Sequence, residues 1–278
     1  MFLERIESLL LIMVVFIPLE RLFALHREQR LFRRLWQLDT IYLLLNPTLI
    51  GLGIKGVLVL LLLLTSWLVP PELQAWVGSQ PFWMQFPVLL ILADLGFYCA
   101  HRTFHSVPWL WKFHAVHHSI EEMDWLAAHR VHPIDQIMTK AASILPIFVL
   151  GFSAGPIAAF GLLYQWQSLF IHSNVKIEFG PLSWILATPR FHHWHHADHP
   201  EAYNRNFAGQ LPFLDALFGT MHMPAAEMPA RYGSDTPVPQ NYGAQLLFPF
   251  RQAAKPPGTL PPQIAAPSGK PGGSLLPG

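Results

Sequence analysis

The sequence contains few charged residues and almost no cysteine. Asp, Glu, Lys and Arg make up 13% of its 278 residues, whereas 52% are hydrophobic, a balance outside the usual range of soluble domains. The formal net charge of +1, without a basic face, gives no electrostatic reason to expect nucleic-acid binding. The single cysteine, Cys99, excludes an internal disulfide framework, and we expect it to be buried in its apolar segment. These absences favour an integral membrane protein.

Apolar segments along the chain predict membrane helices. Residues 8–25 are expected to form an imperfect first helix, and they contain no signal-peptide cleavage site. Two further segments, 41–69 and 82–105, are long enough to cross a bilayer. Two shorter segments follow at 137–150 and 157–171. The two shorter segments are joined by turn residues 151–156, so they form either a hairpin that dips into the membrane or two short spanning helices.

The distribution of arginine predicts the orientation of these helices. Four arginines lie within residues 27–34, whereas residues 72–81 contain neither Lys nor Arg. By the positive-inside rule, we expect loop 27–34 in the cytoplasm and the short turn 70–81 on the opposite side. With this topology, every histidine cluster comes to the cytoplasmic membrane surface.

The chain is expected to form one all-α domain with a tail. Residues 1–223 predict a membrane-embedded helical bundle with a histidine-rich helical cap on its cytoplasmic side. Residues 224–278 contain 12 prolines, and their last part, Lys255–Gly278, is typical of a disordered tail.

Histidine is abundant and clustered, because 13 of the 15 histidines lie within residues 101–199. Three clusters have regular spacing: His101 and His105; His114, His117 and His118; and His192, His195 and His196. Residues three or four apart share one face of a helix, so we expect each cluster to point in one direction. Eight neutral imidazoles exceed what one metal ion accepts, and the hairpin adds His172 as a ninth. The sequence therefore predicts two metal ions.

The other histidines are expected to lie outside the metal site. His193 breaks the spacing and is interpreted as a spacer or a support for a ligand. Surface roles are expected for the isolated His26, His199 and His222. His129 and His132 are more typical of a structural or substrate-facing role, although a ligand there stays an alternative.

One carboxylate lies within an apolar segment. Asp94 shares a helical stripe with His101 and His105, so we predict that it orients a ligand imidazole by accepting its second N–H. A helix–helix hydrogen bond is the alternative. Carboxylates expected near the site, where they would offset metal charge, are Glu121, Glu122, Asp124 and Asp198.

Four ordered motifs carry a family resemblance. They are Asp94-Leu-Gly-Phe-Tyr-Cys-Ala-His101-Arg-Thr-Phe-His105, Phe113-His-Ala-Val-His-His-Ser119, Arg190-Phe-His-His-Trp-His-His196 and Asn206-Phe-Ala-Gly-Gln-Leu-Pro-Phe-Leu-Asp215-Ala-Leu-Phe-Gly-Thr220. With these motifs, residues 94–220 resemble bacterial members of the fatty acid hydroxylase and sterol desaturase superfamily.

The resemblance implies an oxidoreductase with a non-haem di-iron centre that uses O2 to hydroxylate or desaturate a C–H bond of a lipid. The implied iron ligands are His101, His105, His114, His117, His118, His172, His192, His195 and His196. Zinc could replace iron in a purified sample. The substrate would be a membrane lipid with a sterol, acyl, alkyl or isoprenoid chain. Electrons would come from a separate reductase, ferredoxin or cytochrome. The implied location is a bacterial inner membrane, which the protein crosses several times.

Other classes of protein fit the sequence less well. A histidine-rich metal transporter or sensor would need ligands along a path through the membrane, whereas these histidines gather at one face. A membrane zinc protease of the His-Glu-x-x-His type is excluded because that motif is absent. A catalytically silent homologue stays an alternative.

Overall fold

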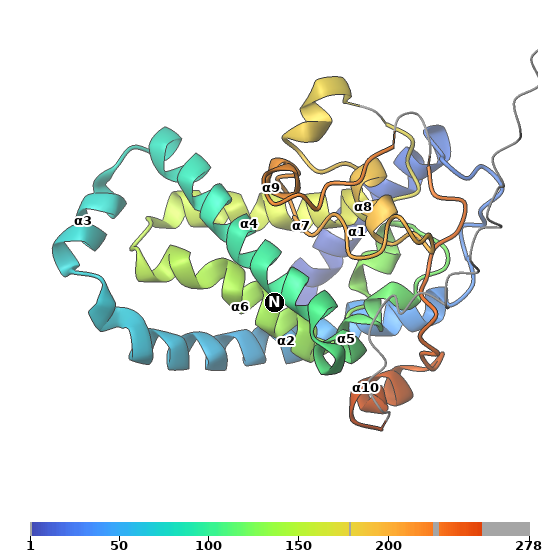
Figure 1. The fold of residues 1–278 in the computed structure, drawn as a ribbon, viewed down its shortest axis with the longest axis horizontal. Helices are drawn as coiled ribbons and strands as arrows, with labels where there is room; N and C mark the ends of the chain where they lie inside the picture. The colour runs from blue at the N-terminus through green and yellow to red at the C-terminus, as the bar shows by residue number, and fades with distance from the viewer. Residues whose placement is uncertain (1, 178, 225–227, 252–278) are drawn as a thin grey trace, which may run out of the picture.

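The structure is a computed structural model that describes residues 2–177, 179–224 and 228–251. Within these ranges it is helical and has no strand, which confirms the all-α prediction; Figure 1 shows the arrangement. In chain order the α-helices are α1 (Phe2–Leu22), α2 (Trp36–Thr65), α3 (Pro71–Ser79), α4 (Phe82–Ser106), α5 (Pro108–His114), α6 (Pro133–Val149), α7 (Ala154–His172), α8 (Pro189–His195), α9 (Phe213–Leu217) and α10 (Tyr242–Arg251). Short 3₁₀ helices are η1 (Ser66–Leu68), η2 (His117–Ser119), η3 (Trp125–His129) and η4 (Gly180–Trp184).

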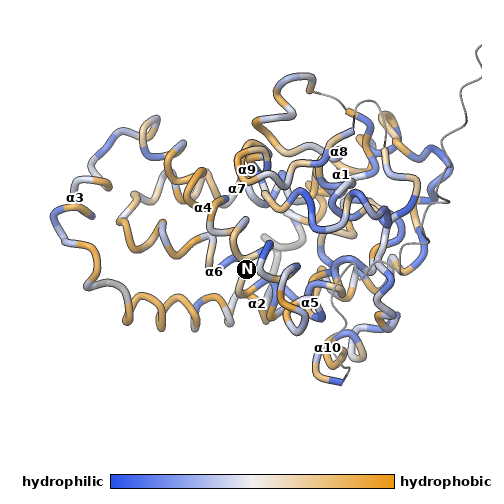
Figure 2. Tube along the Cα trace, in the orientation of Figure 1, coloured by the Kyte–Doolittle hydropathy of each residue, from blue (hydrophilic) through white to orange (hydrophobic). Residues whose placement is uncertain are grey.

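The long helices α2, α4, α6 and α7 extend to one side of the molecule, where α3 joins α2 to α4 (Figure 1). Apolar residues concentrate on this side, whereas polar segments gather at the opposite end (Figure 2). In the described part of the chain, two helices are long and apolar enough to cross a bilayer: α2, with a mean hydropathy of 2.2, and α4, with 1.5. Only 6% of the apolar window of α2 is buried, unlike a helix in a soluble core. The exposed apolar face of α2 is therefore suited to lipid.

Proline and a few polar side chains set the helix ends near the site. Pro108, Pro133 and Pro189 each occupy the first turn of a helix, where the missing N–H costs nothing. The His132 imidazole accepts a hydrogen bond from the Ile134 backbone N–H at 3.2 Å and thereby caps α6. These starts direct α5, α6 and α8 toward one another at the polar end.

The turn predicted at residues 70–81 is wrong in one respect, because it contains helix α3. Pro71 stands at a favoured first position and Glu72 lies in the first turn, where a carboxylate interacts well with the helix dipole. No described residue of α3 is buried. The Gln74 side chain donates to the Val149 carbonyl at 2.9 Å, so α3 covers the α6–α7 turn.

The helices α4 and α6 approach each other closely at Gly96. A Cβ atom at this position would lie 2.2 Å from the Ala142 carbonyl oxygen. Only glycine fits this contact without a shift of the backbone. Three residues after Gly96, Cys99 is exposed, so the prediction that it is buried is wrong; it lies on the outward surface of an apolar helix.

A buried ion network holds the polar end together. The Arg33 guanidinium donates to Asp39 and Asp124, both at 2.6 Å, and Arg130 donates to Asp39 at 2.5 and 2.9 Å. Buried charges are tolerated when they are paired and hydrogen-bonded in this way. The network ties α2 to both ends of η3, where Asp124 and Arg130 lie.

The region after residue 223 differs in part from the predicted tail. The helix α10 packs on α2 and α5, and its buried Gln245 accepts a hydrogen bond from the Tyr42 hydroxyl at 2.7 Å. Residues 228–251 therefore continue the domain that we predicted to end at residue 223. The predicted disordered segment, Lys255–Gly278, lies outside the described residues.

Candidate metal centre

Nine buried histidines form two adjacent groups at the polar end of the long helices. In each group, one nitrogen of every imidazole lies within 4.8 Å of the others. The five-histidine group contains His101, His105, His114, His118 and His195. The four-histidine group contains His117, His172, His192 and His196. The structure thus brings together all nine histidines that the sequence suggested as ligands.

The second and third histidine clusters of the sequence each contribute residues to both groups, which their spacing did not predict. We expected His114, His117 and His118 to point in one direction, but His117 belongs to the four-histidine group and the other two to the five-histidine group. The reason is that α5 ends at His114, and the chain turns into η2 instead of continuing as one helix. The third cluster divides likewise, because His195 and His196 are consecutive and leave α8 in different directions.

Five imidazoles have their outer nitrogen fixed by an acceptor. The Nδ1–H of His101 donates to the Phe207 carbonyl at 2.7 Å. The other four donors and their acceptors are His114 to the Asp135 carboxylate at 2.7 Å, His117 to the Arg130 carbonyl at 3.0 Å, His172 to the Ser168 carbonyl at 2.7 Å and His195 to the Arg205 carbonyl at 2.8 Å. An Nδ1–H donor leaves the Nε2 lone pair of a neutral imidazole free for a metal.

In each group, two of these lone pairs face each other. The Nε2 atoms of His101 and His114 lie 3.0 Å apart, and those of His117 and His172 lie 3.2 Å apart. Since both members of each pair donate through Nδ1, no proton lies between the two Nε2 atoms, and their lone pairs repel. A cation would remove this repulsion, and metal–nitrogen bonds of about 2.0–2.1 Å allow ligand nitrogens at such separations. The donor set therefore fits one metal ion in each group.

Burial keeps the imidazoles neutral. Desolvation lowers the pKa of His114, His117, His118, His192 and His196 well below the usual value, and lowers the pKa of His195 to about 3. Neighbouring imidazoles add to this effect because each charged ring would repel the next. Neutral histidine is the form that binds iron or zinc.

The carboxylate beside the site is Asp135 rather than Asp94. Among the described hydrogen bonds of Asp94 there is none to an imidazole: it accepts from the backbone N–H groups of residues 209–211 at 2.7–3.0 Å. Asp94 thus holds the segment whose Phe207 carbonyl accepts from His101, which differs from the direct contact that we predicted. The helical stripe was correct, since Asp94, His101 and His105 are all buried in α4. The sequence signal for Asp135 was its place in the first turn of a helix that starts next to His132-Pro133.

The four other candidate carboxylates contact other groups in the described chain. Glu121 and Glu122 accept from Arg34, and Asp124 pairs with Arg33. Asp198 accepts from the Tyr203 hydroxyl at 2.7 Å and lies 3.3 Å from Arg231. The arginine-rich loop therefore takes three of the charges that we expected to offset the metals.

The remaining histidines lie outside the two groups. His193 is buried between the Tyr232 hydroxyl, 2.9 Å away, and the Ser173 carbonyl, 3.1 Å away. His132 caps α6, as described above. The Nε2 of His129 is buried without a hydrogen-bond partner in the described chain, and this side chain lines a cavity. The isolated positions are His26, which contacts Tyr232, and His199 and His222, which pack on Trp194.

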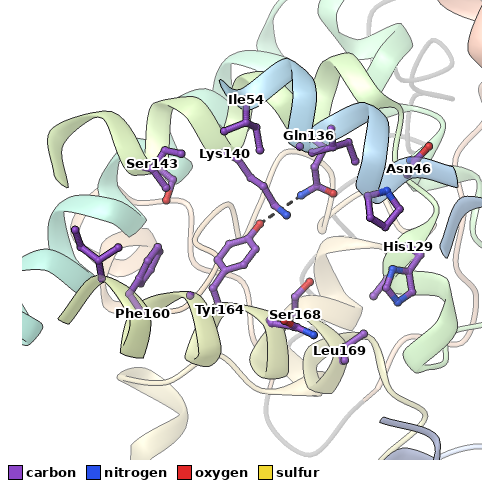
Figure 3. Close-up of a pocket in the computed structure, with 18 of the residues that line it drawn as sticks. Asn46, Ile54, His129, Gln136, Lys140, Ser143, Phe160, Tyr164, Ser168 and Leu169 are labelled. Atoms are coloured by element: carbon purple, nitrogen blue, oxygen red, sulfur yellow. Dashed lines mark hydrogen bonds between the residues drawn. The ribbon is translucent and has the colours of Figure 1, made fainter. Parts of the chain in front are cut away.

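Two adjoining cavities lie between the apolar helices and the histidines. The larger has a volume of about 520 Å³, lies among α2, α6 and α7, and is lined mainly by apolar side chains such as Ile54 and Phe160 (Figure 3). The smaller, of about 60 Å³, is lined by histidines of both groups and by Asp135. Ala128, Gln136, Tyr164 and Ser168 line both, so the cavities adjoin there. Pockets of several hundred Å³ with few polar groups are typical of small-molecule sites.

A further, smaller cavity lies on the other side of the five-histidine group. It has a volume of about 30 Å³ and is lined by His105, His118 and His195 together with polar residues such as Asn204 and Asp235. The four-histidine group does not line it. The two groups therefore differ in their surroundings.

Comparison with known proteins places these residues in a family context. A fatty acid hydroxylase family model matches residues 86–220, which include all nine histidines. The chain is 33% identical over 180 residues to ornithine lipid hydroxylase OlsE of Rhizobium tropici, covering 65% of this chain and 54% of the relative. It is 35% identical over 147 residues to alkylglycerol monooxygenase of Homo sapiens, covering 52% and 32%, and 32% identical over 168 residues to that of Xenopus tropicalis, covering 59% and 35%. The chain thus spans about half or less of these relatives. No solved structure matches it significantly.

Proposed function

We propose that this chain, whose residues 86–220 belong to the fatty acid hydroxylase superfamily, is an integral-membrane, di-iron lipid hydroxylase that uses O2. The observation that carries the proposal is the pair of neutral, buried histidine groups whose facing lone pairs need a cation. Their position beside an apolar cavity at the end of lipid-exposed helices supports a lipid substrate.

The nine histidines would hold two iron ions, one in each group. When bound, the iron ions supply the redox chemistry that activates O2 for attack on an unactivated C–H bond. The protein contributes ligand geometry, because acceptors fix the tautomer of five imidazoles. It also excludes bulk water, since all nine side chains are buried. Burial raises the pKa of Asp135 to about 8, and the positive charge of a bound metal ion would lower it, so that Asp135 would then be a charged acceptor for His114.

The proposed reaction inserts one oxygen atom into a C–H bond and releases the other as water, which consumes two electrons and two protons. A separate reductase, ferredoxin or cytochrome would supply the electrons. We favour hydroxylation over desaturation because the relatives are named as hydroxylases and monooxygenases. The names of these two relatives also make a lipid with a polar head group, rather than a sterol, our first choice of substrate.

We also propose that the metal centre faces the cytoplasm. The arginine-rich loop lies at the same end as the histidines, as the hydrogen bond from Gln29 to the Met123 carbonyl at 2.8 Å indicates. The turn between α6 and α7 contacts α3 at the opposite end. With α2 and α4 crossing the membrane, the positive-inside rule then orients the protein.

Comparative lipid mass spectrometry tests the proposed function. Cells that express the chain are compared with cells that express His117→Ala, and iron is measured in the purified proteins. We expect a lipid with one added oxygen only in cells with the unaltered chain, which should bind two iron ions. A lipid that has lost two hydrogens instead would identify a desaturase. Metal uptake by vesicles without any change in lipids would overturn the proposal in favour of a transporter.

A further inference from the structure

The large cavity contains a lysine whose surroundings lack a negative charge. Lys140 lies on α6, and its ammonium points into the cavity toward Tyr164 and Gln136 (Figure 3). Its nitrogen stands over the Tyr164 ring, 5.3 Å from the centroid. In the described part of the chain, Lys140 forms no hydrogen bond or ion pair with a protein group. A cation–π contact replaces only part of the hydration that an ammonium loses in an apolar site.

Carboxylates of the neighbouring elements, including Asp94, are hydrogen-bonded to other groups. None of the described residues that line the large cavity is Asp or Glu. Asp135, five residues before Lys140, lines the smaller cavity and accepts the His114 N–H. Asp39 is bound by two guanidinium groups, those of Arg33 and Arg130. The cavity therefore has one cation and no anion of its own.

Further hydrogen-bonding groups surround the ammonium. The Nε2 of His129 is buried without a partner in the residues that the structure describes, and it lines the same cavity. The Gln136 amide and the Tyr164 hydroxyl are 3.5 Å apart, a weak contact that leaves both able to bind another group. Beyond them the wall is apolar, with Ile54 and Phe160 (Figure 3). One polar cluster in an otherwise apolar pocket matches a ligand with one polar end and one hydrocarbon chain.

We propose that Lys140 binds an anionic oxygen group, a carboxylate or a phosphate, of a lipid whose hydrocarbon chain fills the large cavity. This inference rests on the proposed function, since it assigns the charge class of the lipid that reaches the histidines. Gln136 and Tyr164 line both cavities, so the anionic group is anchored at their junction. Lys140 is thus a residue that determines substrate specificity and positions the lipid.

Ligand binding to the zinc-loaded full-length protein in nanodiscs tests this assignment without turnover, because zinc has no redox chemistry. The probes share a 16-carbon chain: palmitate and palmitoyl lysophosphatidic acid are anionic, while hexadecanol and monopalmitoylglycerol are neutral. We expect at least one anionic probe to bind about tenfold tighter than its neutral counterpart, as a charge-assisted hydrogen bond to an ammonium in an apolar cavity gives. Equal binding of anionic and neutral probes to the unaltered protein would overturn the proposal.

Variants locate the effect. Lys140→Met should bring the anionic-to-neutral preference to about one while neutral probes bind as before, and Lys140→Arg should retain it. Lys55→Met is the matched control, because Lys55 is an exposed lysine on α2 that does not line the cavity. An unchanged preference in Lys140→Met, or its loss in Lys55→Met as well, would contradict the assignment. Should Lys140→Met bind no zinc, Lys140→Gln replaces it, with the same expected result.

The result of the Lys140 binding test can be distinguished from the result of the lipid-oxidation test of the proposed function. A charge preference that depends on Lys140, without oxidation of any lipid by the iron-loaded protein, would leave a lipid-binding site and remove the hydroxylase. Oxidation of a lipid without such a preference would retain the hydroxylase and remove the role of Lys140.

Discussion

The two histidine groups use similar ligands but have different support. In the five-histidine group, three imidazoles donate through Nδ1, and one acceptor is the carboxylate of Asp135. In the four-histidine group, two imidazoles donate, both to backbone carbonyls. The Nδ1 atoms of His192 and His196 have no partner in the described chain. One group is therefore better anchored than the other, and it alone has a carboxyl group among its acceptors.

This difference predicts that the two metal ions are not equivalent. Acceptors behind a metal-bound imidazole fix its orientation and make it a stronger donor. The four-histidine group has fewer ligand nitrogens for a metal ion, and fewer of its imidazoles donate to an acceptor. We therefore expect it to bind its metal ion more weakly. Three of its members, His117, His172 and His192, line the small cavity that adjoins the apolar one. Of the five-histidine group, only His101 and His114 line this cavity. The group expected to bind metal more weakly therefore has more histidines next to the proposed substrate cavity.

Removal of one histidine from each group should have the largest effect. His192→Ala leaves three donors in its group, whereas His118→Ala leaves four in the other. We expect both variants to lose lipid oxidation, but only His192→Ala to bind about one metal ion per chain after dialysis. In His192→Ala, the loss of metal affinity at the four-histidine group should be larger than the loss of about 10–100-fold that is typical when a supporting hydrogen-bond acceptor is removed. Metal analysis by mass spectrometry measures this, with the exposed His199→Ala as control; equal metal loss in both variants would contradict the ranking.

Removal of the Asp135 charge should weaken the five-histidine group selectively. In Asp135→Asn, the His114 Nδ1–H loses its anionic acceptor, so we expect about 10–100-fold weaker metal binding at this group. The affinity of the four-histidine group should stay unchanged, which separates this effect from general unfolding. Titration with a competing chelator resolves the two affinities. Asp198→Asn, at a partly exposed carboxylate that accepts from Tyr203 and pairs with Arg231, is the control. A uniform loss at both groups would mean that Asp135 acts only through the fold.

Replacement of a buried histidine outside both groups should have the smallest effect on metal. His193→Gln removes one of two hydrogen bonds, to Tyr232 or to Ser173. We expect about 1 kcal/mol less stability, the usual contribution of a buried hydrogen bond, with two metal ions still bound. Thermal unfolding of the zinc-loaded protein and metal analysis measure the two quantities. Loss of a metal ion in His193→Gln would mean that His193 takes part in metal binding, which would contradict its assignment outside both groups.

Several features of the site followed from local sequence patterns. The spacing of the three clusters singled out eight histidines, and the direction of the apolar segments added His172, because a hairpin returns the chain to the side from which it started. The structure places these nine together, although their role as ligands stays a prediction. The apolar length of α2 and α4 likewise predicted the two helices that can cross a membrane.

Other features depended on contacts between distant segments. Asp94 was assigned to an imidazole of its own helix, but its carboxylate binds backbone groups more than 100 residues later. Asp135 escaped attention because its link to His114 spans two helices. Glu121, Glu122 and Asp124 were expected to offset metal charge, but they contact the arginines of a distant loop, Arg33 and Arg34.

The sequence by itself indicated two helices long and apolar enough to cross a membrane and the set of nine histidines that gathers at one end of the molecule, because apolar length and helical spacing are local properties. Only the tertiary structure decided how the nine histidines divide into five and four. That division depends on where α5 ends, on how consecutive side chains leave α8, and on which carbonyl or carboxylate from another element meets each imidazole. The proposed anion-binding role of Lys140 likewise depends on the tertiary structure, because α2, α6 and α7 together enclose a cavity whose described lining contains Lys140 and no carboxylate.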